Sequence, residues 1–369
     1  MIVKTVGEYP CLKDFLKFPW AVYKGVENWV PPLLMDQQFI LTDNPFWEHA
    51  EKELFIAYND AEKPVGRIAA VIDNNYIKFQ GEKTGFFGFY ESVNDDAVAG
   101  ALYAAAAAWL KAKGMSKMIG PMNPSTNDEA GFLCDGFNTP PRLMMPHTHP
   151  YYLELAEKSG LTKAKELYAY DMDVSAGPQE RLERLAVITH KKNPGLVVRK
   201  LNKKDFKNEI NKAIAVYNSA WEKNWGFVPW TDKEFHTMAS RLKELLLLDT
   251  TLLAEINGEP AGMLIAVPDY NMVFSKMNGR LFPFGIFKFL YHKSKIDALR
   301  LMIMGVVKQH RQRGIEGLMY FEALKNAKRL GFKKCEFSWV LDDNIMTQRA
   351  AEMMGGKLYK KYRVYEKVL

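Results

Sequence analysis

The chain has 369 residues, more than one ordinary hydrophobic core supports, so its length predicts two domains. Apolar residues make up 48% and charged residues 25%, a balance that indicates a soluble globular protein. The formal charge of +7 suits an anionic ligand, and it suits tRNA or an anionic membrane surface equally well.

Cysteine usage and the N-terminal sequence exclude several classes of protein. The cysteines are scattered and odd in number: Cys11, Cys134 and Cys335. They predict a reducing compartment and exclude a disulfide framework or a zinc site. Charges and Pro10 interrupt residues 1–15, so we expect no signal peptide, and the apolar run 97–110 is too short to span a bilayer. We therefore expect a cytoplasmic protein without stable membrane insertion.

The first half of the chain opens on strands that the second half repeats. Residues 55–57 and 64–71 predict two strands with a turn between them, and residues 252–254 and 260–267 predict the same pair again. Turn-forming residues separate the strands in both pairs.

A helix and a strand follow in each half. Residues 96–113 predict a helix that ends at a glycine, followed by a strand over 116–120, and residues 315–330 and 333–340 repeat this order. The last strands of the two halves are residues 167–174 and 361–369. Two copies of one α/β unit explain the length better than one large domain.

The boundary between the copies lies at residues 175–178, where Ser-Ala-Gly-Pro breaks secondary structure. We therefore predict an N-terminal domain over residues 1–177 and a C-terminal domain over residues 178–369. The separation between matched positions changes by about twenty residues at two points, which places one insert in each copy. The first insert lies between Asn127 and Tyr151, and the second lies within Asp269 to Ile296.

In the second copy a strand turns sharply into a helix. Residues 299–307 form an apolar run typical of a buried strand, a basic stretch follows, and apolar residues recur at helical spacing after Gly314. The turn also contains Arg311, Arg313 and Gly317. Unpaired backbone N–H groups and the helix dipole favour an anion at such a turn, so the pattern predicts a diphosphate site. The alternative is a plain helix N-terminus whose basic residues face solvent.

Residues 311–316, Arg-Gln-Arg-Gly-Ile-Glu, resemble the acetyl-CoA loop of the GNAT (GCN5-related N-acetyltransferase) superfamily, which reads Arg/Gln-x-x-Gly-x-Gly/Ala. Glu316 stands where Gly or Ala is usual, and Gly317 would take over the close approach one residue later. The resemblance implies an α/β (α+β) fold of two tandem GNAT-like units, each a mixed, mostly antiparallel sheet flanked by helices. Residues 121–152 resemble a segment of large, uncharacterised bacterial GNAT-like proteins.

The resemblance also implies a co-substrate, acetyl-CoA or another acyl-CoA, and no metal. The residues implied to bind it are Val306, Val307, Arg311, Gln312, Arg313, Gly314, Ile315, Gly317 and Asn344. The strand end near 305–307 would offer a backbone N–H to the thioester carbonyl. Asn344 matches an asparagine that the family places near the pantetheine arm, although it would equally cap a helix. Ala351 stands where the family often has a tyrosine as general acid.

The catalytic acid and base stay unassigned from the sequence. Four side chains are candidates for the base: Asp297, His310, Glu336 and Asp342. The first copy has Asn-Asp-Asp-Ala at residues 94–97, where the second has its arginines and glycine. These acids suit a helix N-cap and would repel a diphosphate, so we expect one cofactor site, in the second copy.

The two inserts each have more than one interpretation. Residues 121–152 would form a structural plug or a substrate wall, and the sequence does not favour either. His147 and His149 lack a third ligand at useful spacing, so a Pro-rich turn is favoured over a metal site. The aromatic insert 269–296 would form a lid, a membrane-surface contact, a dimer contact, or a core-packing helix, which is the commonest fate of such a stripe.

Three functions are compatible with the sequence. The first is an acyl-CoA-dependent N-acyltransferase, acetyl being the expected group, that acts on a small amine or amino acid. The second is a Fem-like transferase that uses aminoacyl-tRNA, which the basic charge permits but the Arg-rich turn does not favour. The third is a non-catalytic protein that binds CoA or another ligand through a relict loop. No DNA partner is expected, and a homodimer is compatible with the sequence.

Overall fold

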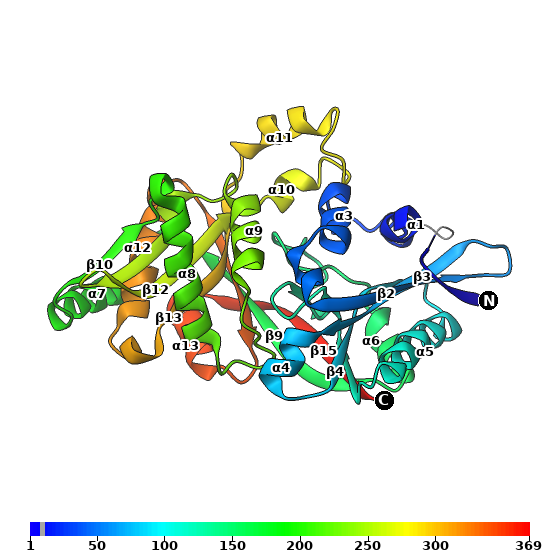
Figure 1. The fold of residues 1–369 in the computed structure, drawn as a ribbon. Coiled ribbons are helices and arrows are strands. Elements are labelled where there is room, and N and C mark those ends of the chain that lie inside the picture. Colours follow the sequence, from blue (N-terminus) through cyan, green and yellow to red (C-terminus); the bar gives the residue numbers. More distant parts are fainter. Residues whose placement is uncertain (8–11) are drawn as a thin grey trace. The chain divides into compact units, whose positions relative to one another are not determined.

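The computed structural model describes residues 1–7 and 12–369, so Cys11 lies outside the described residues. The chain forms two compact units. Unit 1 comprises residues 1–167, 271–293 and 360–369, and unit 2 comprises residues 168–270 and 294–359. Figure 1 shows the elements of both. These units differ from the predicted domains in three segments: 168–177, 271–293 and 360–369. The division into sequence copies at residue 177 stays a prediction.

Unit 1 contains a mixed sheet and a separate sheet of two short strands, the sixth and seventh in chain order. Its strands are β1 (Ile2–Thr5), β2 (Ala50–Tyr58), β3 (Pro64–Asp73), β4 (Thr84–Ser92), β5 (Lys117–Gly120), β6 (Met122–Asn123), β7 (Glu129–Ala130) and β8 (Phe132–Asp135). Its helices are α1 (Leu12–Lys17), α2 (Pro19–Val22), α3 (Leu34–Thr42), η1 (Pro45–Glu48), α4 (Asn74–Gln80), α5 (Asp96–Ala112), α6 (Tyr151–Lys158), α10 (Asn271–Phe274) and α11 (Gly285–Lys293). Strands β1 to β4 pair antiparallel in chain order, and β4 pairs with β5 in parallel.

Unit 2 repeats this arrangement. Its strands are β10 (Leu196–Lys200), β11 (Thr251–Ile256), β12 (Glu259–Pro268), β13 (Ala298–Val306) and β14 (Lys334–Leu341). Its helices are α7 (Glu180–Lys192), η2 (Lys203–Asp205), α8 (Phe206–Trp221), α9 (Asp232–Leu242), η3 (Leu248–Thr250), η4 (Lys308–His310), α12 (Ile315–Arg329) and α13 (Ile345–Met353). Strands β10 to β13 pair antiparallel in chain order, and β13 pairs with β14 in parallel. The chain passes between the units within β9 (Thr162–Asp173) and β15 (Lys357–Val368).

The helix that follows the fourth strand is set up by the same residue types in both units. Apolar residues at helical spacing bury one face of α5 and one face of α12 against their sheets, including Leu102 and Leu318. Each helix is followed by a glycine in the left-handed conformation, Gly114 with φ +83° and Gly331 with φ +82°. The predicted α/β (α+β) class, with mixed, mostly antiparallel sheets flanked by helices, is confirmed.

Strands β7 and β8 and helices α10 and α11 lie within the two predicted inserts, whereas β6 precedes the first of them. Between β5 and α6, unit 1 contains the short strands β6, β7 and β8. Between β12 and β13 the chain forms α10 and α11, whereas the matching connection between β3 and β4 holds only α4. The insert 271–293 counts with unit 1, although its sequence neighbours belong to unit 2.

Candidate functional site

The central strands of unit 2 separate at one end. Strand β13 pairs with β14 over residues 298–301 and 334–337. Strand β13 then continues to Val306, and β14 continues to Leu341, without further pairs between the two strands among the described residues. Beyond Leu301, the edge of β13 that faces away from β12 therefore lacks a strand partner.

Val306 presents its backbone at this unpaired edge. The N–H of Val307 donates to the carbonyl oxygen of Ala261 at 2.9 Å, so it is committed to the sheet. Because backbone N–H groups alternate in direction along a strand, the N–H of Val306 points away from β12. Of the two predicted valines, Val306 is thus the one whose N–H suits a thioester or a pantetheine amide.

The loop after β13 presents the helix N-terminus as predicted. Gln312 has φ +62° and Gly314 has φ +82°, and Gly314 caps α12 without a side-chain hydrogen bond. The first-turn N–H groups of a helix have no intrahelical partner, and Ile315 and Gly317 lie in this first turn. An anion placed here would meet several N–H groups and the positive end of the helix dipole.

The C-terminal end of helix α7 forms hydrogen bonds with this loop. The Asn193 side-chain NH₂ donates to the carbonyl oxygens of Arg313 at 3.1 Å and Thr189 at 2.8 Å. The hydroxyl of Thr189 lies 3.4 Å from the carbonyl oxygen of Gly314. A Cβ on Gly314 would come within 2.4 Å of that hydroxyl oxygen, so position 314 needs glycine for space as well as for its φ.

The two arginines of the loop have different surroundings. Arg311 donates through Nη2 to the carbonyl oxygen of Ala220 at 2.7 Å, and its Nε lies 3.4 Å from the carbonyl oxygen of Val306. Arg311 therefore holds the loop against the end of β13. Arg313 lies 3.4 Å from the His310 ring, a weak contact that leaves its guanidinium able to bind an anion.

Glu316 lies at the helix end, where the family pattern has a small residue. Its carboxylate interacts with its own backbone N–H, and burial raises the pKa of this carboxyl while the Arg311 charge opposes the rise. A carboxylate at this place competes with a diphosphate for the helix N-terminus. In contrast, a Cβ on Gly317 would meet only Leu182, at 4.0 Å, so the helix surface is open there.

Asn344 is the N-cap of α13, and its side-chain oxygen Oδ1 accepts from the N–H of Thr347 at 3.2 Å. The helix-capping alternative is therefore confirmed, while the side-chain NH₂ keeps its donors for the predicted pantetheine contact. Ala351 is fully buried in the core of unit 2, so no acid–base group stands at the position where the family has tyrosine.

Among the candidate bases, Glu336 belongs to a buried network. It accepts from Ser338 Oγ at 2.6 Å and from the Tyr359 hydroxyl, and it lies 3.6 Å from Arg300 Nε. Such a network orders the middle of a sheet, which favours a structural role. Asp297 forms an ion pair with Lys333 at 3.0 Å. Burial and the Arg313 charge lower the pKa of His310, so its imidazole is neutral near pH 7 and able to accept a proton.

In unit 1 the matching positions are occupied by side chains. Val93 N–H donates to the Val65 carbonyl at 2.9 Å, so Ser92 corresponds to Val306. The Ser92 N–H donates to the Tyr152 hydroxyl at 3.2 Å, and the Tyr151 hydroxyl donates to the Ser92 carbonyl at 2.9 Å. These two tyrosines, at the start of α6, thus bind both backbone groups of Ser92, whereas in unit 2 the carbonyl oxygen of Val306 is contacted by Arg311.

The helix end of unit 1 is filled as well. The Asp95 carboxylate accepts from the N–H groups of Ala97 at 2.8 Å and Val98 at 3.1 Å, which caps α5. A capped helix end with two acids offers no diphosphate site. One cofactor site, in the second copy, stays a prediction.

Unit 1 nevertheless has a hollow of its own, with about 850 Å³ of space that includes its opening to solvent. Its polar lining consists of Gln37, Arg67, Glu91, Asn123, Glu129, His147, Thr148 and Asn271. Its apolar lining includes Trp29, Phe89, Phe132, Met144 and Met145. Residues 121–152 supply much of the lining of this hollow. The same segment ends in the tyrosines that bind the backbone of Ser92.

Arg67 and Glu91 form a buried pair on neighbouring strands of this hollow. Arg67 is 5% exposed, donates to the Phe15 carbonyl at 2.8 Å and lies 3.8 Å from the Glu91 carboxylate. Among the described residues its Nε is buried without a hydrogen-bond partner. Glu91 accepts from the Tyr152 hydroxyl at 2.7 Å, and burial raises its pKa to about 7 although Arg67 opposes the rise.

Sequence reasoning missed this pair. The signal was available, because single charged residues interrupt the apolar strands 64–73 and 84–92. The two histidines of the insert take part in packing. His147 lines the hollow, and burial lowers its pKa to about 4. The His149 ring stacks between Tyr23 and Tyr151, with centroids 4.6 and 4.8 Å away. In residues 1–7 and 12–369, no group of three or more His, Cys, Asp or Glu side chains is arranged to hold a metal ion.

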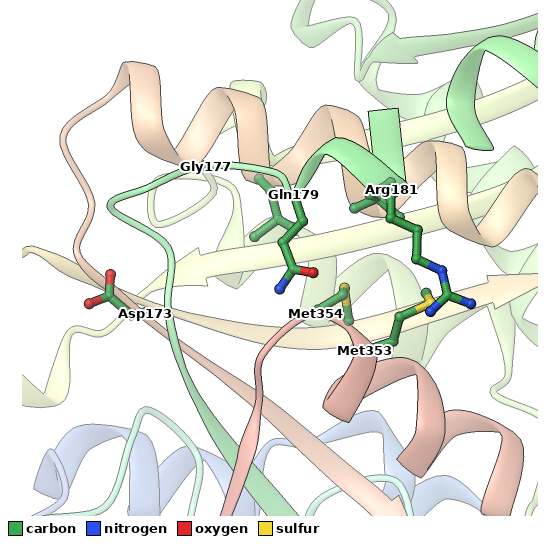
Figure 2. Close-up of a pocket in the computed structure, with 8 residues that line it drawn as sticks. Asp173, Gly177, Gln179, Arg181, Met353 and Met354 are labelled. Atoms are coloured by element: carbon green, nitrogen blue, oxygen red, sulfur yellow. The ribbon is translucent and has the colours of Figure 1, made fainter. Parts of the chain in front are cut away.

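A second, smaller hollow of about 340 Å³ lies in unit 2. Figure 2 shows Gln179 and Arg181, at the start of α7, beside Met353 and Met354 at the end of α13. None of the residues predicted to bind CoA lines it, so it is separate from the candidate site.

Two curated proteins match this chain over almost its full length. Protein YghO of Escherichia coli K12 is 36% identical over 376 residues, which cover 99% of this chain and 95% of that protein. The bacterial ceramide synthase of Caulobacter vibrioides is 37% identical over 376 residues, which cover 100% and 96%. No family model matches the chain.

Solved structures share the fold at low sequence identity. A tandem GNAT protein from the clavulanic acid biosynthesis pathway has a TM-score of 0.56 at 10% identity, covering 100% of this chain and 98% of that one. A glucosamine N-acetyltransferase region of a fungal β-N-acetylglucosaminidase has a TM-score of 0.61 at 15% identity, covering 99% of this chain and 38% of that one. The predicted tandem GNAT-like fold is confirmed.

Two glycines of the loop are expected to respond differently to alanine. Gly314→Ala should lower the free energy of unfolding by roughly 1–3 kcal/mol, because alanine at this φ is strained and crowds Thr189. Gly317→Ala should leave stability unchanged or raise it by up to about 1 kcal/mol, since the site is open and helical. Its Cβ should nevertheless weaken CoA binding. Thermal denaturation and calorimetric titration with CoA check both; unchanged CoA affinity in Gly317→Ala would refute the close approach at residue 317.

The raised pKa of Glu91 predicts a pH dependence of stability. A carboxyl whose folded pKa is about 7 binds its proton more tightly in the folded state than in the unfolded one, so stability falls as pH rises from about 5 to 8. Glu91→Gln, which mimics the protonated form, should lack this loss. The melting temperature of Glu91→Gln minus that of the natural protein should be larger at pH 8 than at pH 5.5, by roughly 3 °C or more. A difference that does not change with pH would contradict the raised pKa.

Proposed function

The chain belongs to the family of tandem GNAT-like proteins that includes protein YghO and bacterial ceramide synthase, and on this premise we propose that it is an N-acyltransferase that uses acyl-CoA. The observation that carries the proposal is the contrast between Val306 and Ser92. Among the described residues the edge of β13 at Val306 has no strand partner on the β14 side, and the N-cap residue of α12 makes no side-chain hydrogen bond, while tyrosine and aspartate side chains bind the matching groups beside Ser92.

The proposed donor site uses backbone groups for the phosphates and the thioester. The diphosphate of CoA would accept hydrogen bonds from first-turn N–H groups at Ile315 and Gly317 and from the guanidinium of Arg313. The pantetheine arm would follow the edge of β13. The N–H of Val306 would then donate to the thioester carbonyl or to a pantetheine amide, with Asn344 as a second donor.

The reaction itself needs a neutral amine. The amine nitrogen attacks the thioester carbon, the C–S bond breaks, and the amine proton passes through a base or water while the CoA thiolate takes up a proton. His310 is neutral near pH 7 and lies in the donor loop, so we propose it as a proton acceptor from unit 2.

The name of the relative from Caulobacter vibrioides, bacterial ceramide synthase, suggests a class of donor and a class of acceptor. A ceramide is the amide of a fatty acid with a long-chain amino alcohol, so we propose a long-chain amino alcohol as acceptor and a fatty acyl-CoA as donor. Acetyl-CoA, the donor expected from the sequence, is the alternative donor.

Two observations favour a second candidate, a ligand-binding protein without catalysis. Glu316 partly occupies the diphosphate end of α12, and Ala351 removes the usual general acid. Such a protein would bind CoA but would not release thiol from acyl-CoA. The Fem-like alternative predicts copurifying tRNA.

The transfer experiment combines the purified protein with palmitoyl-CoA or acetyl-CoA and sphinganine. Release of CoA is followed with a thiol reagent, and the amide is identified by mass spectrometry. We expect the N-palmitoyl amide, and we expect Arg313→Ala to lower kcat/KM roughly tenfold or more, because a charged hydrogen bond to the diphosphate is lost. Lys325→Ala, on an exposed part of the same helix, is the matched control and should not change the rate. Binding of CoA without thiol release from either donor would support the non-catalytic candidate instead.

Glu316 gives a prediction of opposite sign. Glu316→Ala should tighten CoA binding by about two- to fivefold, since a negative charge leaves the helix N-terminus. Glu322→Ala, two turns further along α12, should leave the affinity unchanged. Calorimetric titration at low ionic strength measures both, and weaker binding by Glu316→Ala would show that no anion binds at this helix end.

A further inference from the structure

The insert 271–293 presents an apolar surface to solvent. Five large apolar side chains are between 64% and 75% exposed: Phe282, Phe284, Phe287, Leu290 and Tyr291. Three of them lie on α11, and two lie in the loop directly before it. The expectation of a core-packing helix is therefore wrong for this stripe, because a packed helix would bury these rings.

The insert itself is firmly attached to unit 1. The Asn271 side chain donates to the carbonyl oxygens of Pro141 at 2.9 Å and Arg142 at 2.8 Å, and Trp20 donates to the Asn278 side chain at 2.9 Å. Val273 and Met277 are buried. The insert that carries the exposed aromatic residues is therefore held by hydrogen bonds and buried side chains. Figure 1 shows α10 and α11 as two short helices joined by a loop.

The charged residues within the insert have one sign. Lys276, Arg280, Lys288 and Lys293 are exposed, and residues 270–296 contain no aspartate or glutamate. Lys288 donates to the Lys276 carbonyl at 2.9 Å, and Lys293 lies 5.8 Å from the Phe289 ring, so part of the positive charge is held beside the apolar side chains. Exposed aromatic residues flanked by lysine and arginine are suited to the interface of an anionic bilayer. There, aromatic side chains enter the head-group region and the cationic side chains contact lipid phosphates.

We propose that the segment 271–293 is a membrane-docking element that binds the surface of an anionic bilayer through Phe282, Phe284, Phe287, Leu290 and Tyr291 and through its lysine and arginine residues. The contact is interfacial: no helix in the described part of the chain is long and apolar enough to cross a membrane. The absence of acids argues against a second copy of the same face as occupant, since two such faces would repel each other. This goes beyond the proposed reaction, because it places the protein where long-chain substrates reside.

The test is co-sedimentation with vesicles of phosphatidylcholine alone or mixed with phosphatidylglycerol. We expect binding to the mixed vesicles that weakens with added salt, and little binding to phosphatidylcholine. Phe284→Ser with Phe287→Ser should lower the partition coefficient at least tenfold, and so should Lys288→Glu with Lys293→Glu. Phe79→Ser, at an exposed phenylalanine of unit 1 outside the insert, is the matched control and should bind like the natural protein.

Circular dichroism melts establish that each variant is folded, so loss of lipid binding is not loss of structure. Thiol release with a water-soluble donor and acceptor should be the same in all four proteins, which separates docking from the proposed reaction. Absence of binding to anionic vesicles by the natural protein would overturn the proposal. A second result would also overturn it: the natural protein forms a concentration-dependent dimer in sedimentation velocity, and the phenylalanine variant loses the dimer but still binds vesicles.

Discussion

Backbone polar groups that leave a sheet or begin a helix must find partners, and this requirement distinguishes the two units. Where the fourth and fifth strands separate, one edge of the fourth strand loses its neighbour, and the next helix starts close by. In unit 1 the Tyr151 and Tyr152 hydroxyls and the Asp95 carboxylate supply the partners. In unit 2 the N-cap residue Gly314 makes no side-chain hydrogen bond, and we propose that the N–H of Val306 and the start of α12 bind the amides and phosphates of CoA.

Much of the fold could be predicted from the sequence, because its signals are local. The apolar strand ending at Val306 and the helix after Gly314 follow from periodicity, and the paired glycines 114 and 331 mark helix ends. The compact units could not be predicted, since they depend on which surface the insert 271–293 packs against. Local patterns carry no information about that choice.

The candidate site was predicted in part for the same reason. A loop motif is contiguous, so Arg313 and Gly314 could be found from the sequence. The hollow of unit 1 is assembled from segments far apart in the chain, and Arg67 and Glu91 meet only when β3 and β4 pair. The aromatic residues of the insert 269–296 predict an apolar stripe, but whether such a stripe is buried or exposed depends on tertiary packing.

Hydrogen exchange with and without CoA tests the central claim most directly, because it reports on backbone N–H groups in both units at once. The account predicts that CoA slows exchange in peptides covering residues 306–317 and leaves peptides covering residues 92–98 unchanged. Slower exchange at 92–98, or no change at 306–317 when CoA is bound, would contradict it.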